Sequence, residues 1–138
     1  MEHLFDLDLR YEGDYVVERP HGGLDGVGYA AGAGRAIGPL VEGDVRFSNN
    51  PRVRGDGALL ANLAGAISTD DGAKIVFSFN GLGRKDENGR SFTALVAGTV
   101  ESADERYAWV NGIVCVAEAK VVGRHVQMHV HRLHAADT

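Results

Sequence analysis

The chain contains very little cysteine and proline: among its 138 residues there are one cysteine and three prolines. A single cysteine cannot form an internal disulfide, which fits a reducing compartment. Cys115 lies in the apolar run GIVCVA, where a buried, unreactive thiol is a better interpretation than a nucleophile. Cysteine chemistry is therefore not expected to carry the function.

Long hydrophobic runs and targeting segments are also lacking. No stretch approaches the roughly 18 apolar residues that a transmembrane helix needs. The acidic, alternating start MEHLFDLDLRYEGDY has no basic segment followed by an apolar one, so we expect no signal peptide. These absences predict a cytoplasmic protein without a membrane partner.

Basic residues are outnumbered, with 14 Lys and Arg against 19 Asp and Glu and a net charge of −5. A general nucleic-acid binder needs a basic surface to neutralise phosphates, so nucleic acid is not an expected partner. Hydrophobic residues make up 44% and charged residues 24%, which excludes a disordered chain. The length predicts a single domain over 1–138 with its own core.

Glycine is abundant, with 19 residues that punctuate short runs rich in valine, isoleucine and aromatics. These runs have the alternation of β-strands, and turn sequences such as TDDGA at 69–73 separate them. Asp-Gly tolerates the backbone of a tight hairpin. The expected strands include HLFDLDLRY, PLVEGDVRF, AKIVFSFNG, RSFTALVAGTV, YAWVNGIVCVAEAKVV and RHVQMHVHRL.

The segment GALLANLAGAIS, 57–68, has helical spacing of its leucines, yet it leads directly into the Asp-Gly hairpin. We therefore predict a strand there. The whole chain then has seven to nine strands and little helix. Closing into a barrel hides all sheet edges, so we predict an all-β fold: a single antiparallel closed β-barrel, with a sandwich as the alternative.

Two motifs suggest a cofactor or a metal. GVGYAA at 26–31 matches a dinucleotide fingerprint, but further glycines follow where that motif needs a helix, so no cofactor is expected. In GRHVQMHVHRLH, 123–134, alternation places His125, His129 and His131 on one face. His129 and His131 could hold a metal, but no glutamate follows them, and we expect a histidine stripe on the barrel's closing strand.

Candidates for proton transfer and ligand contact lie near one another in the sequence. Glu101 and Glu118 both follow apolar strand segments, and either could face a cavity with a raised pKa. In ERYAWVNG, 105–112, strand alternation would place Tyr107, Trp109 and Asn111 on one face. Such a face would suit a small organic ligand in a barrel lumen, and equally a core aromatic pair with an edge asparagine.

TDDGAKI at 69–75, Glu101-Ser102 and YAWVN at 107–111 resemble, in order and separation, the DUF3237 (UPF0311) family. The resemblance implies a small barrel similar to those of allene oxide cyclases, dirigent proteins and lipocalins. It also implies a homo-oligomer, dimer or trimer, that holds a small hydrophobic or aromatic ligand. Where family members have an Asp-x-Arg-Tyr stretch, this chain has Asn62, which implies a different substrate.

Our leading hypothesis is a cofactor-independent isomerase, cyclase or lyase acting on a small, partly apolar, aromatic or polyketide-like molecule in the lumen. Glu101 would be the acid and base, and Tyr107 and Asn111 would polarise an oxygen. The substrate contacts would be Trp109, Tyr29, Asn62 and Phe79. The alternative is a binding or carrier protein with the same pocket, and a metal-dependent enzyme is a third hypothesis.

Overall fold

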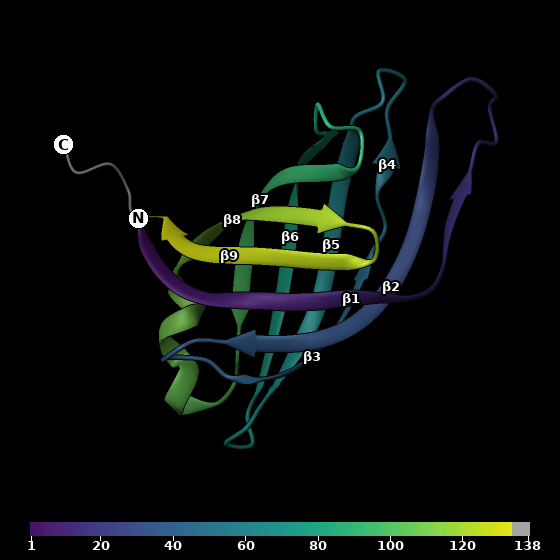
Figure 1. Cartoon of the computed structure of the whole chain (residues 1–138). Helices are drawn as coiled ribbons and strands as arrows, with labels where there is room; N and C mark the ends of the chain where they lie inside the picture. Colours follow the sequence, from purple (N-terminus) through teal and green to yellow (C-terminus); the bar gives the residue numbers. More distant parts are fainter. Residues whose placement is uncertain (134–138) are drawn as a thin grey trace.

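The computed structural model describes residues 1–133 and is dominated by antiparallel strands (Figure 1). Each strand follows a run of alternating hydrophobicity that ends in a turn sequence. The elements are β1 (Glu2–Glu18), β2 (Gly26–Ile37), β3 (Gly43–Asn49), β4 (Arg52–Val53), β5 (Leu59–Thr69), β6 (Lys74–Lys85), β7 (Ser91–Glu101), the 3₁₀ helix η1 (Glu105–Gly112), β8 (Val114–Val122) and β9 (His125–Leu133).

The sheet closes on itself, because β1 pairs with both β2 and β9. Eight strands form the barrel in the order β1-β9-β8-β7-β6-β5-β3-β2, and the two-residue β4 pairs with β2 and β5 at one rim. The prediction of a closed antiparallel barrel is confirmed, and the sandwich alternative is wrong. The prediction that the C-terminal histidine-rich segment is the closing strand is also confirmed.

The strand alternation decides which side chains enter the lumen. In β9, Val126, Met128 and Val130 point inward and are at most 2% exposed. The intervening histidines, His125 and His129, point outward and make polar contacts on the barrel wall. His134, the last histidine of the C-terminal group, lies outside the described residues.

The alanine- and leucine-rich segment 57–68 forms strand β5, as predicted. Leu63 and Ile67 point into the core, and β5 pairs in continuous register with β6 across the Asp-Gly turn. Gly72 in that turn has φ of +94°, a conformation that favours glycine. Tertiary pairing therefore overrides the helical preference of alanine and leucine in this segment.

The prediction of a strand through YAWVN is wrong, because residues 105–112 form η1. The Asp104 carboxylate caps this helix by accepting a hydrogen bond from the Arg106 backbone N–H at 2.9 Å. Every third side chain then turns inward: Tyr107, Val110 and Ile113 are all at most 7% exposed and belong to the core. η1 lies at the end of the barrel where β7 ends and β8 begins (Figure 1).

The β6–β7 hairpin is tied together by one carboxylate. Asp86 accepts hydrogen bonds from Lys120 Nζ at 2.7 Å, from Ser91 Oγ, and from Thr93 Oγ1 at 2.7 Å. These three donors lower the pKa of Asp86 from 3.8 to about 2. The carboxylate therefore stabilises the fold in its ionised form.

We expect this contribution to be complete above the unfolded-state pKa of 3.8 and to be lost as the pH falls towards about 2. Asp86→Asn should be less stable than the wild type at neutral pH and should lose part of the acid dependence. Urea denaturation at a series of pH values measures both effects. Asp14→Asn, at an exposed position of β1, is the control and should keep the wild-type acid dependence. Parallel pH curves for wild type and Asp86→Asn would contradict the expectation.

Candidate functional site

The barrel lumen is filled by side chains at the η1 end and hollow at the other. A cavity of about 330 Å³ opens where β1, β3, β6 and β8 end and where β2, β5, β7 and β9 begin. Its walls are mainly small or apolar side chains, which leave the space unfilled. They include Ala30, Leu59, Ala61, Leu63, Phe92, Ala94, Ala119, Val121 and Val126. Its size and apolar lining are typical of a small-molecule site.

Few polar side chains reach this cavity, and two of them, Tyr11 and Asn49, are hydrogen-bonded to each other. The Asn49 amide Nδ2 donates a hydrogen bond to the Tyr11 hydroxyl at 3.3 Å. Asn49 is itself held by the Asn62 backbone N–H, which donates to its Oδ1 at 3.1 Å. The Tyr11 ring packs against Phe47 with 5.1 Å between ring centroids. The hydroxyl of Tyr11 is therefore held in place from two sides while its O–H can still donate.

Burial raises the pKa of Tyr11 above 10, and the hydrogen bond from Asn49 offsets only part of this effect. Burial also raises the pKa of Tyr15, which lines the same cavity. Both phenols are consequently neutral donors at physiological pH. Arg124 lies at the mouth, where its Nη1 donates to the Gly13 carbonyl at 2.6 Å. Among the described residues that line the cavity there is no carboxylate deep in the lumen to act as a base.

Most of the predicted substrate contacts lie away from this cavity. Phe79 points into the lumen but is fully buried in the packed half, stacked on Phe77 with 5.4 Å between centroids. Tyr29 and Asn62 have exposed side chains on the outward positions of β2 and β5. Trp109, in η1, is 37% exposed. Of these four predicted contacts only Phe79 points into the lumen, because strand parity and η1 turn the other three side chains outward.

Glu101 and Asn111 do come together, in an open depression on the outer surface at the η1 end. The Asn111 amide is fully engaged with the Ser102 backbone: its Oδ1 accepts from the N–H at 2.8 Å and its Nδ2 donates to the carbonyl at 2.9 Å. Glu101 is exposed at the last position of β7. Both residues lie at the far end of the barrel from the cavity, and an acid–base role for Glu101 stays a prediction.

Tyr107, the third predicted catalytic residue, anchors η1 to the β5–β6 turn. Its hydroxyl donates to the Asp71 carboxylate at 2.8 Å, and Asp71 also accepts from Thr69 Oγ1 at 2.5 Å. Burial and the neighbouring Asp71 charge raise the pKa of Tyr107. The phenol therefore stays protonated and holds the helix in place.

We expect Tyr107→Phe to lower the free energy of unfolding by about 1 kcal/mol, because one hydrogen bond to a half-exposed carboxylate is lost. Urea denaturation measures this change. Ligand affinity in the lumen should be unchanged in the same variant. A loss of affinity with unchanged stability would instead support the predicted catalytic role.

The cavity residues Tyr11, Asn49 and Arg124 were not among the predicted site residues. Tyr11 follows Leu7 and Leu9 at alternate positions of HLFDLDLRY, so strand parity alone indicates that it points inward. Asn49 and Arg124 have no such indication, since Asn49 is the last residue of β3 and Arg124 lies in the turn between β8 and β9. Glu118, weighed as a proton carrier, is exposed on the outer wall beside His129.

Fold and cavity together define a small closed antiparallel β-barrel with an apolar lumen that opens at one end. The chain belongs to the DUF3237 family, a family of unknown function, which it matches over residues 1–133. The family resemblance seen in the sequence is therefore confirmed. Among curated proteins, none matches the chain significantly.

Solved structures share this barrel at low sequence identity. A beta-barrel-like protein from Acinetobacter baumannii AYE has a TM-score of 0.86 at 17% identity, with 96% of this chain and 94% of that chain covered. A protein with unknown function from Clostridium acetobutylicum has a TM-score of 0.85 at 18% identity, covering 96% and 98%. A structure described as an enzyme from Penicillium herquei has a TM-score of 0.72 at 18% identity, covering 94% and 92%.

These similarities establish the fold.

Within residues 1–133, no helix has the length and apolar character needed to cross a bilayer.

Proposed function

We propose that the protein binds a small, largely apolar molecule in the open half of its lumen and holds one oxygen of that molecule on Tyr11. The observation that supports this most is the Tyr11 hydroxyl, which is half-buried in an apolar cavity and accepts a hydrogen bond from Asn49. Apolar walls supply affinity through burial, and a few placed donors supply orientation. A bicyclic aromatic alcohol or ketone has the chemistry that such a site favours.

Binding of 2-naphthol and of naphthalene, followed by ligand fluorescence, tests this proposal. We expect 2-naphthol to bind about 3–10-fold more tightly, because it adds one hydrogen bond to the same apolar contact. Tyr11→Phe should remove this difference, and Ala94→Trp should abolish binding of both by filling the cavity. Tyr29→Phe, a tyrosine change on the outer wall, is the matched control and should bind like the wild type. Equal affinities for both ligands in the wild type would overturn the proposed role of Tyr11.

A second candidate function is cofactor-independent isomerase, cyclase or lyase chemistry in the same cavity. It is favoured by the neutral Tyr11 phenol, which could donate a hydrogen bond to a carbonyl oxygen during enolisation, while solvent water accepts the proton that leaves the neighbouring carbon. A relative of the same fold is described as an enzyme, which is compatible with this candidate. Such a donor typically contributes about 10²–10⁴-fold to a rate.

Solvent-deuterium exchange at the carbon beside the carbonyl of 2-tetralone, followed by NMR, separates enzyme from carrier. Exchange that is accelerated by the wild type and lost in Tyr11→Phe, with binding retained, would support catalysis by Tyr11. Loss in Glu101→Gln instead would support the acid–base role predicted for Glu101. Binding without acceleration in any of the three proteins would support the carrier.

A further inference from the structure

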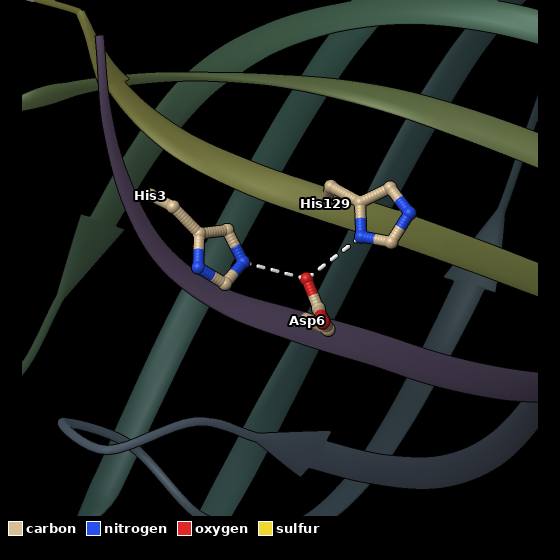
Figure 2. Close-up of side chains that lie close together, drawn as sticks. All are labelled: His3, Asp6 and His129. Atoms are coloured by element: carbon tan, nitrogen blue, oxygen red, sulfur yellow. Dashed lines mark hydrogen bonds and ion pairs between the residues drawn. The ribbon is translucent and has the colours of Figure 1, made fainter.

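A separate polar cluster lies on the outer wall where the first and last strands pair (Figure 2). One oxygen of Asp6, Oδ1, is shared by two imidazoles: His3 Nε2 lies 2.7 Å from it and His129 Nδ1 lies 2.8 Å from it. The candidate ligand atoms of the three residues all lie within 4.8 Å of one another. The side chains are 39%, 44% and 61% exposed for Asp6, His3 and His129, so an ion can reach them from solvent.

The cluster depends on an irregularity in β1. In a regular strand, residues three apart point to opposite faces, so His3 and Asp6 would not meet. A register shift between His3 and Phe5 turns both Leu4 and Phe5 into the core, at 1% exposure each. His3 and Asp6 then share the outer face, and Asp6 is the direct register partner of His129. Bulges that re-aim side chains are frequent beside functional sites.

The charge at this place favours a cation. Asp6 contributes a carboxylate oxygen and the two histidines contribute imidazole nitrogens, and all three side chains are open to solvent. Glu118 is the register partner of His129 on the other side, and its exposed carboxylate adds negative charge to the same wall.

We propose that His3, Asp6 and His129 form a binding site for a late first-row divalent metal ion, with Zn²⁺ as the expected occupant and water completing the coordination. Two imidazoles and one carboxylate are a ligand set that suits Zn²⁺. Ligands about 2.0–2.2 Å from a tetrahedral ion lie roughly 3.5 Å apart. The present distances from Asp6 Oδ1 to the two histidine nitrogens, 2.7 and 2.8 Å, are shorter than this. Because the side chains are half-exposed, small rotations are enough to lengthen these distances to roughly 3.5 Å.

The proposed site keeps His129 from the candidate pair in the sequence, His129 and His131, but uses His3 and Asp6 in place of His131. His131 packs edge-on against His3, with 5.2 Å between ring centroids, and its Nδ1 is 3.2 Å from the His129 carbonyl. It lies beside the proposed site and orients the His3 ring. The ion would link β1 to β9, the two strands whose pairing closes the barrel.

Calorimetric titration of untagged, chelator-treated protein with ZnCl₂ tests the proposal. We expect saturable binding of one ion, and a rise in Tm of roughly 5–10 °C at Zn²⁺ about 100-fold above Kd, because the ion binds the folded state. Asp6→Asn and His129→Ala should each weaken binding at least tenfold. The visible spectrum of the Co²⁺-loaded protein reports tetrahedral nitrogen and oxygen ligation and should be lost in the same variants.

His125→Ala is the matched control, since His125 pairs with Asp8 across the same two strands but without a second histidine. It should bind Zn²⁺ like the wild type. Circular dichroism confirms that each variant is folded. The absence of saturable binding, or binding unaffected by both Asp6→Asn and His129→Ala, would overturn the proposal.

Discussion

Gly98→Ala should destabilise the barrel by on the order of 3 kcal/mol or more, although it adds a single methyl group. Gly98 in β7 is the register partner of Phe79 in β6. A Cβ at this position would overlap the Ser78 carbonyl oxygen and would lie 2.8 Å from Phe79 Cδ1. The carbonyl belongs to the neighbouring strand, so relief requires a shift of the backbone and loss of strand pairing.

Urea denaturation compares Gly98→Ala with the wild type. Gly112→Ala is the control, because a Cβ there meets nothing within 4 Å. The control should unfold within about 0.5 kcal/mol of the wild type. If Gly98→Ala were equally stable, β6 and β7 would have to lie farther apart than they do here.

Phe79→Ala should cost about 3–5 kcal/mol, since it removes a fully buried ring from the packed half of the lumen. The ring stacks on Phe77 and also lies over Gly98, where no side chain competes for the space. A partial recovery in Phe79→Leu would show that volume accounts for most of the loss. Chemical denaturation of the three proteins measures these differences.

Phe92→Ala is the informative comparison for Phe79→Ala. Phe92 is half-buried and lines the cavity, so its removal should cost less stability and should weaken binding of 2-naphthol. Phe79→Ala should leave that binding intact as long as the barrel is folded. If Phe79→Ala weakened binding and Phe92→Ala did not, Phe79 would be a ligand contact, as the sequence predicted.

The fold could be predicted because its determinants are local. Alternation along 5–9 and 125–131 and the Asp-Gly turn at 71–72 each indicate strands and hairpins without knowledge of the partners. The helical spacing in 57–68 does not produce a helix, because the adjoining hairpin pairs this segment with β6. The exception is η1. Its inward residues at 107, 110 and 113 are three positions apart, but the same segment also fits the strand alternation that would place Tyr107, Trp109 and Asn111 on one face.

The site could be predicted only in part, because a cavity depends on volumes contributed by many strands. Small residues such as Ala61, Ala94 and Ala119 leave the open half of the lumen hollow, and their meeting place follows from strand register. The His3–Asp6–His129 cluster depends in the same way on one bulge and on the pairing of residues 123 positions apart. Neither arrangement is contained in any single stretch of sequence.

The pairing of β1 with β9 also has a consequence for the order of events in folding. Asp8 and His125 meet although 117 residues separate them, whereas short turns join β5 to β6, β6 to β7 and β8 to β9, and η1 joins β7 to β8. Loop-closure entropy disfavours the long-range pairing until the intervening hairpins have formed. We therefore expect the chain to form an open, curved sheet before β1 and β9 seal the barrel, so that the lumen becomes an enclosed space only in the final step.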